Sequence, residues 1–134
     1  MAGKKILIAD DEARLRKLVS DYLVREGYEV LEAADGEQAL DIFYREKDLS
    51  LMILDVMMPG VDGFMVCKEV RETSQIPIVM LTAKSEENDI LNGYEYGADE
   101  YIPKPFSPKI LVAHVNAIIR RTSDADDGNK ELLE

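Results

Sequence analysis

Apolar residues in this chain of 134 residues are grouped in short runs, and the stretches between the runs carry apolar residues at helical spacing. Short apolar runs between turn residues are typical of strands, and a spacing of three and four is typical of amphipathic helices. The expected strands are Lys4–Ala9, Glu29–Ala33, Leu51–Leu54, Ile78–Leu81 and Tyr101–Ile102. The expected helices are Glu12–Glu26, one that opens at Asp35-Gly36, Gly63–Glu72, Glu86–Tyr96, and one from Pro108 to about Arg121.

A strand followed by a helix repeats about five times in this pattern. Short connections and right-handed crossovers then favour a parallel sheet with helices on both faces. The unbroken apolar character of the strands agrees, since strands of a covered parallel sheet are buried on both faces. The sequence therefore predicts an α/β fold with a doubly wound, five-stranded parallel sheet of the flavodoxin-like kind.

The periodic pattern ends near Arg121. Residues 122–134 are polar, carry five acidic residues and one Lys, and lack periodicity until Leu132-Leu133. The length suits a single domain. We therefore expect one domain over residues 1–121, followed by an acidic, flexible tail or interdomain linker over residues 122–134.

Acidic side chains follow two of the expected strands at the point where each strand ends. Asp10 and Asp11 come directly after the first strand, and Asp55 ends the third. Open α/β sheets place their chemistry at this edge, so neighbouring strands would bring the three carboxylates together. Like charges at contact distance need a cation, and hard oxygen ligands in a small, wet site suit Mg²⁺. The alternative is that Asp10 and Asp11 only cap the following helix.

Two further polar side chains end the remaining strands. Thr82 follows the fourth strand and Lys104 the fifth. A rotatable hydroxyl and an ammonium suit an anionic group carried on Asp55. Alternatively, Thr82 is an ordinary β-branched strand residue and Lys104 a solvated surface charge. The prolines on either side of Lys104 weaken the second alternative, and a cis bond to Pro105 would turn the lysine inward.

The charge balance limits the partners of the chain. With 16 basic and 27 acidic residues, the net charge is −11, which repels nucleic acid phosphates. No apolar run approaches the ~20 residues needed to span a bilayer, and the N-terminus lacks the pattern of a signal peptide. Cys67 is the single cysteine, which fits a reducing compartment. These features predict a cytoplasmic protein that binds neither DNA nor a membrane by itself.

Together, these residues resemble a known family. Residues 4–121 are similar to the receiver (CheY-like) domain of bacterial two-component response regulators. The motifs that carry the resemblance are Asp10-Asp11, LDVMMPGVDG around Asp55, Thr82-Ala83, and GADEYIPKPF around Lys104. The resemblance implies that Asp55 accepts a phosphoryl group from a sensor histidine kinase. Such a domain is not an ordinary enzyme, but it assists its own phosphorylation and dephosphorylation.

The resemblance also assigns roles to the neighbouring residues. It implies that Asp11, Asp55 and the backbone carbonyl of Met57 ligate Mg²⁺, and that Asp10 acts largely through water. Thr82 and Lys104 would bind the phosphoryl oxygens.

Three further residues are implied to act after phosphorylation. Tyr101 would turn inward when Thr82 moves, although a half-buried strand tyrosine needs no such switch. Met57 and Lys84 would flank the approach of the hydrolytic water. Met57 offers no hydrogen bond to that water, so slow loss of the phosphoryl group is expected.

The run GYEYGADEYIPKPFSPK looks most like the OmpR/PhoB subfamily, whose members join a receiver to a DNA-binding winged helix. These receivers typically pair, when phosphorylated, through a face built from the fourth helix, fifth strand and fifth helix. Here the corresponding residues are Ile90, Glu95, Asp99, Glu100, Ile110, His114 and Arg121. Ile90, Ile110 and His114 depart from the usual charges, so we expect a weak or atypical homodimer. The alternative is that the two isoleucines are buried within the monomer.

Other functions stay open on the sequence alone. The chain would be a stand-alone receiver if no DNA-binding domain is attached to it, acting by protein contact or in a phosphorelay. A flavodoxin-like electron carrier would need a Ser/Thr/Gly-rich cradle after the first strand, where Asp10-Asp11-Glu12 stands. An aspartyl-phosphate hydrolase would need an acid where Met57 stands. A histidine phosphocarrier would have to use His114.

Overall fold

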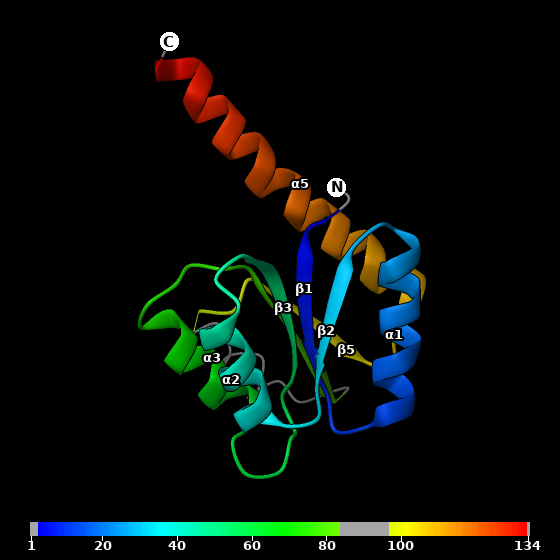
Figure 1. Ribbon diagram of the computed structural model, residues 1–134. Helices are drawn as coiled ribbons and strands as arrows, with labels where there is room; N and C mark the ends of the chain where they lie inside the picture. The colour runs from blue at the N-terminus through cyan, green and yellow to red at the C-terminus, as the bar shows by residue number, and fades with distance from the viewer. Residues whose placement is uncertain (1–2, 84–96, 134) are drawn as a thin grey trace.

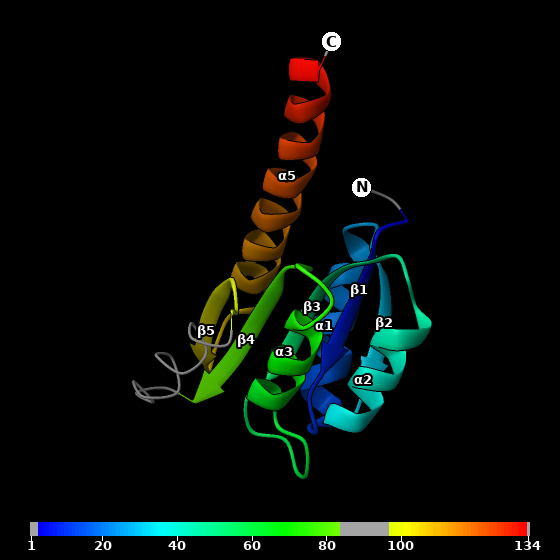
Figure 2. The same ribbon diagram turned by 90° about the vertical axis from the view of Figure 1, so that its left-hand side faces the viewer.

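The strands of the protein form one parallel sheet. The computed structural model describes residues 3–83 and 97–133, with side chains through residue 122. The strand order across the sheet is β2-β1-β3-β4-β5, and every described pair is parallel. Figure 2 shows the strands in this order. The predicted doubly wound α/β fold is confirmed.

The elements follow the expected sequence pattern closely. The strands are β1 Lys5–Ala9, β2 Glu29–Ala33, β3 Leu49–Asp55, β4 Ile78–Ala83 and β5 Glu100–Lys104. The described helices are α1 Ala13–Arg25, α2 Gly36–Arg45, α3 Gly63–Arg71 and α5 Pro108–Leu133. The helix expected over Glu86–Tyr96 lies outside the described residues.

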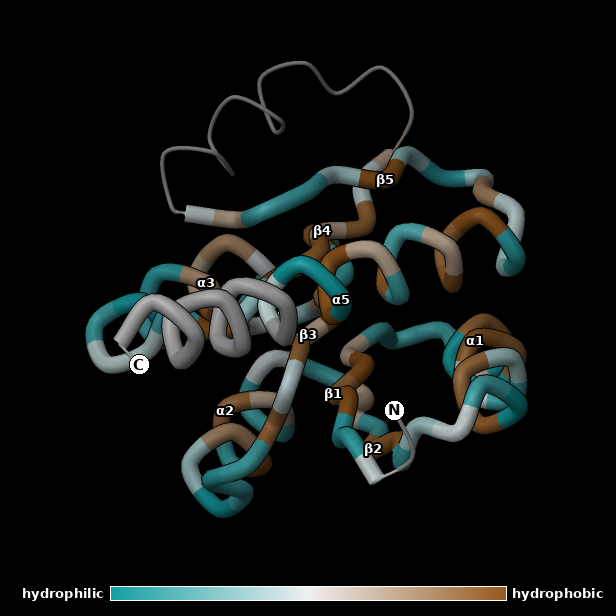
Figure 3. The backbone as a smooth tube through the Cα atoms, turned by 90° about the horizontal axis from the view of Figure 1, so that it is seen from above, coloured by the Kyte–Doolittle hydropathy of each residue, from teal (hydrophilic) through white to brown (hydrophobic). Residues whose placement is uncertain are grey.

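Helices cover both faces of the sheet. The alternating side chains of the central strands point to opposite faces and form two separate cores. Ile6, Ile53 and Leu81 pack with residues of α1 and α5, including Val19 and Leu111. On the other face the core is made with α2 and α3, and its members include Leu7, Met52, Met80, Ile42 and Val66. Figure 3 shows α1 on one side of the strands and α2 and α3 on the other. Burial on both faces explains why the strands are apolar without alternation.

The winding of the chain reverses between β1 and β3. The two strands are neighbours at the centre of the sheet, with Ala9 opposite Leu54. The chain reaches β2 on one side of β1, then crosses to β3 and continues to β4 and β5 on the other side. Such a reversal leaves a crevice at the carboxyl ends of the two central strands. The residues that follow Ala9 and Leu54 therefore stand at this crevice.

Gly63 brings the start of α3 against the end of β3. A Cβ atom at Gly63 would lie 2.5 Å from the carbonyl oxygen of Asp55, so no larger residue fits without a shift of backbone. The Gly63 amide also donates to the carbonyl of Val56 at 3.0 Å. These contacts fix the backbone directly beside Asp55.

The last helix is longer than the sequence predicts. We expected it to end near Arg121, which is wrong, because α5 continues to Leu133. In Figure 1 its red end projects beyond the sheet. Each residue added to a helix that has already formed gains a backbone hydrogen bond within the same helix. The helix can therefore continue where it has no apolar face to bury. The division of the chain after residue 121 remains a prediction. Among the helices described, α5 included, none has an apolar stretch that would cross a bilayer.

Candidate functional site

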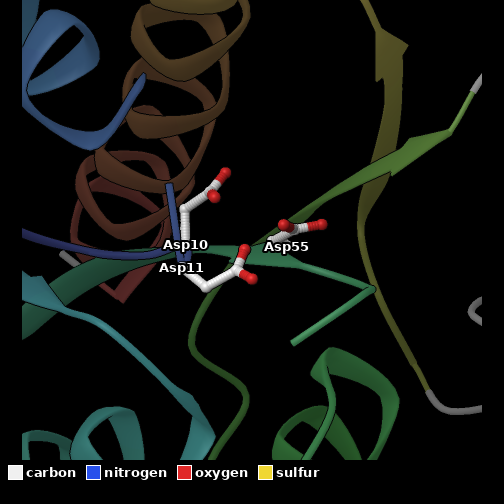
Figure 4. Close-up of side chains that lie close together, drawn as sticks. All are labelled: Asp10, Asp11 and Asp55. Atoms are coloured by element: carbon white, nitrogen blue, oxygen red, sulfur yellow. The ribbon is translucent and has the colours of Figure 1, made fainter. Parts of the chain in front are cut away.

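Three carboxylates meet at the carboxyl ends of β1 and β3. Asp10, Asp11 and Asp55 each offer an oxygen, and these oxygens lie within 4.8 Å of one another. Figure 4 shows the three side chains gathered at this edge of the sheet. Asp10 is fully buried, Asp55 is 4% exposed, and Asp11 is exposed. The structure thus brings together the three acids that the sequence singled out.

Lys104 bridges the two buried acids. Its Nζ lies 3.1 Å from Oδ2 of Asp10 and 3.1 Å from Oδ2 of Asp55. A third carboxylate, that of Glu12, lies 3.8 Å from the same ammonium. The peptide bond between Lys104 and Pro105 is cis. Lys104 is therefore an ionic partner of the acids, not the solvated surface charge of the alternative interpretation.

One ammonium does not fully balance this site. Burial of Asp55, with the nearby charge of Asp10 as a second cause, raises the pKa of Asp55 to about 6. Lys104 and the amide of Met57, which donates to Oδ1 of Asp55 at 3.1 Å, act in the opposite direction. Burial alone would lower the pKa of Lys104, but its hydrogen bonds and attraction to Asp55 and Asp10 raise it overall. The ionised cluster would therefore be stabilised by a further cation, and its oxygen ligands suit Mg²⁺.

A cavity of about 620 Å³ opens over the acids. Its lining is Asp11, Glu12, Leu15, Asp55, Met57, Ala83, Lys104, Pro105 and Phe106. Asp55 and Lys104 are thus reachable from solvent although both are largely buried. Apolar and charged side chains thus line the same cavity.

Thr82 and Tyr101 are not among the residues that line this cavity. Thr82 is fully buried at the end of β4, and its hydroxyl donates only a long contact of 3.5 Å to the carbonyl of Ala83. Tyr101 is half-buried on β5, opposite Met80, and packs against the core that faces α2 and α3. The two residues thus stand on neighbouring strands, as a switch between them requires.

The residues expected on a dimer face have partners within the monomer. Asp99 Oδ2 accepts from Arg71 Nη2 at 3.0 Å and from the amide of Ile78 at 2.8 Å. Glu100 Oε1 lies 2.7 Å from His114 Nδ1.

Of the two isoleucines expected on this face, Ile90 and Ile110, the structure describes Ile110. Ile110 is 56% exposed, so the alternative that it is buried within the monomer is wrong. Arg121 is exposed as well. The candidates Ile90 and Glu95, and the lifetime candidate Lys84, lie outside the described residues.

Sequence reasoning missed Arg16. Its guanidinium donates from Nη1 to the backbone carbonyl of Asp10 at 2.7 Å and from Nε to Glu32 at 3.0 Å. Its position one helical turn after Glu12 was readable in the sequence. That position alone does not distinguish an arginine that folds back over the preceding turn from one that points into water.

Comparison with known proteins agrees with this geometry. The model of the response regulator receiver domain matches residues 6–116. The chain therefore belongs to the response regulator receiver domain family, a signalling family and not one of electron carriers or phosphohydrolases.

Individual relatives support the same assignment. "Probable transcriptional regulator ycf27" of Porphyridium aerugineum is 50% identical over 96% of this chain and 53% of its own length. Transcriptional regulatory protein ResD of Bacillus subtilis is 50% identical over 89% of this chain and 49% of its own length. The chain thus spans about half the length of the curated relatives it matches. The structure of chemotaxis protein CheY4 of Vibrio cholerae superposes with a TM-score of 0.80 at 37% identity, covering 87% of this chain and 98% of that one.

The raised pKa of Asp55 predicts a change of stability with pH. Because the pKa of about 6 exceeds the ordinary 3.8, the folded protein holds this proton more tightly than the unfolded chain. The associated stabilisation is present below pH ~4 and is lost as the pH rises through ~6. Asp55→Asn removes this loss. Without divalent cations, we expect it to raise the free energy of unfolding by about 1–3 kcal/mol at pH 7, and by little at pH 4.

Urea unfolding of wild type and variant at the two pH values checks this. Asp21→Asn, on the exposed surface of α1, is the control and should change stability by less than about 0.5 kcal/mol. An Asp55→Asn protein less stable than wild type at pH 7 would contradict the electrostatic account of the site.

Proposed function

We propose that this receiver domain accepts a phosphoryl group on Asp55 from a sensor histidine kinase, with Mg²⁺ in the site. The observation that carries the proposal is that Asp55 lies in one cluster with Asp10 and Asp11, 3.1 Å from the Lys104 ammonium, in the lining of an open cavity. A carboxylate that is reachable from the cavity and lies beside fixed positive charge is what an in-line attack on a phosphoryl group needs.

The transfer forms one bond and breaks one. A carboxylate oxygen of Asp55 bonds to phosphorus, while the bond between phosphorus and the imidazole nitrogen of the kinase breaks and leaves its electron pair on that nitrogen. The product is an acyl phosphate. Lys104 already lies 3.1 Å from Asp55 and would bind a phosphoryl oxygen, with the Thr82 hydroxyl as a second donor. The protein thus contributes position and charge, and no covalent step beyond the Asp55 bond.

The cation would be held by Asp11, Asp55 and the backbone carbonyl of Met57, with Asp10 acting through water. Access to the cavity supports this division. Asp10 is fully buried and is not among the lining residues, whereas Asp55 is among them. Asp11 is exposed and lines the cavity. When bound, Mg²⁺ would neutralise charge shared by the Asp55 carboxylate and the phosphoryl group.

The signal would leave through Thr82 and Tyr101. Movement of the Thr82 hydroxyl toward the phosphoryl group would vacate space that Tyr101 can fill, which shifts a population between two states. The relatives ycf27 and ResD are about twice as long and are named as transcriptional regulators. We therefore infer that the receiver controls a DNA-binding domain outside these residues. The alternative of a stand-alone receiver is decided by the full-length reading frame.

Phosphorylation should depend on Asp55 and on a divalent cation. With a small-molecule donor such as phosphoramidate, we expect mass spectrometry to show one added phosphoryl group on wild type. Asp55→Asn, or EDTA, should abolish it, whereas Asp21→Asn should label like wild type. Full labelling of Asp55→Asn would falsify the assignment.

The lifetime of the acyl phosphate should depend on Met57. Its side chain is 68% exposed at the rim of the cavity and carries no group that orients water. We expect slow hydrolysis in wild type and a several-fold faster loss of phosphate in Met57→Asn. Met65→Asn is the matched control, since Met65 is also exposed but stands on α3. An unchanged or slower loss in Met57→Asn would rule out this role.

Self-association should be weak and insensitive to salt. Glu100 is already paired with His114 and Asp99 with Arg71 inside the monomer, whereas Ile110 is exposed. Apolar contacts are therefore expected to dominate a pair formed through this face. Analytical ultracentrifugation with and without beryllofluoride, at about 0.05 M and 0.5 M ionic strength, measures this. A tight dimer that dissociates as salt rises would show that an intermolecular charge network persists.

A further inference from the structure

The turn between β1 and α1 lacks the support that the corresponding turns have. Asp35 caps α2 by accepting from the amide of Gln38 at 2.8 Å, and Asp62 caps α3 by accepting from the amide of Met65 at 2.9 Å. Glu12, at the same position before α1, makes no side-chain cap. Yet this is the turn that carries Asp10 and Asp11. The Asp10 side chain spans part of the turn by accepting from the amide of Glu12 at 2.9 Å, and a second contact comes from further along α1.

Arg16 makes this second contact. From the second turn of α1 it reaches back to the carbonyl oxygen of Asp10, at 2.7 Å from Nη1. Its Nε donates to Glu32 on β2 at 3.0 Å, so the guanidinium is fixed from a second element. The Arg16 side chain is only 18% exposed. The guanidinium presents these two donors in a rigid planar fork, whereas the ammonium of a lysine is a compact charge on a flexible stem.

With this contact, every hydrogen-bonding group of Asp10 is satisfied. Its amide donates to the carbonyl of Ala33 at 3.1 Å, its two carboxylate oxygens accept from Glu12 and Lys104, and its carbonyl accepts from Arg16. Asp10 is fully buried, so loss of the Arg16 contact would leave a buried carbonyl without its partner. An unpaired buried carbonyl is unfavourable, and a rotation of the turn would relieve it. Such a rotation would also move Asp11, the next residue.

We propose that Arg16 is a positioning residue for the cation site: it holds the β1–α1 turn so that Asp10 and Asp11 face Asp55. The inference rests on the proposed binding of a divalent cation by this cluster. It assigns to Arg16 no contact with the cation or with the phosphoryl group.

The sign of the effect separates positioning from charge. Arg16 is a cation beside an acidic site, so by charge alone its removal would strengthen the binding of Mg²⁺. By positioning, its removal weakens the binding. Lys17, the next residue on α1, carries the same charge but is largely exposed and pairs only with Asp21 at 3.9 Å. Lys17→Ala is therefore a charge-matched control.

The experiment is titration of the full chain with Mg²⁺ alone, by calorimetry, for wild type, Arg16→Ala, Arg16→Lys and Lys17→Ala. We expect the dissociation constant to rise at least fivefold in Arg16→Ala, and to stay equal or fall slightly in Lys17→Ala. Arg16→Lys keeps the charge but not the fork, so its constant should lie between wild type and Arg16→Ala. Glu32→Gln keeps Arg16 and weakens only its anchor, and a rise of about two- to threefold is expected.

The outcomes are distinct. Unchanged or tighter Mg²⁺ binding by Arg16→Ala, or full recovery by Arg16→Lys, would overturn the positioning role while leaving the proposed function intact. Absence of Mg²⁺ binding by wild type would overturn both. Urea unfolding of each variant shows whether it is folded. If Arg16→Ala does not fold, wild-type affinity in both Arg16→Lys and Glu32→Gln would overturn the inference.

Discussion

The repulsion between two buried carboxylates is the constraint around which this site is organised. Among the residues that the structure describes, Asp10 and Asp55 share one close ammonium, that of Lys104, at 3.1 Å from each. Burial and the charge of Asp10 raise the pKa of Asp55 to about 6, so the ionised acids are held together at a cost in stability. A site held in this way binds positive charge, and a cation near Asp55 would favour the approach of an anionic phosphoryl group.

The fold supplies the rigidity that keeps such charges together. The neighbouring positions of β1 and β3 bring their carboxyl ends to one crevice, and Gly63 allows α3 to start directly against the backbone of Asp55. Arg16 closes the β1–α1 turn from the other side. Each of these contacts involves backbone, so the backbone positions that carry the carboxylates are held in place. Two apolar cores stabilise the rest of the domain, and this stability offsets the repulsion between the clustered carboxylates.

The surface away from the site shows how this receiver differs in detail from the pattern of its subfamily. Within the monomer, Glu100 pairs with His114 and Asp99 pairs with Arg71. These side chains are therefore already paired before any second copy of the chain could bind them. Exposed Ile110 leaves an apolar residue on the same helix as His114. The acid cluster and this surface therefore follow separate constraints: buried charge in the first, pairing of exposed side chains in the second.

The sequence determined the strands, the sheet type and the acid trio, because each depends on local order. Apolar runs such as Leu51–Leu54 identify buried strands, and the residues that follow parallel strands must meet at one edge. Side-chain partners depend on contacts across the fold, and only the tertiary structure decided them. It paired Asp99 with Arg71, 28 positions away, and turned Arg16 onto the Asp10 carbonyl. The tertiary structure also extends α5 past Arg121. The sequence placed the end of this helix where its apolar face ends, but the backbone hydrogen bonds of a helix can continue without an apolar face.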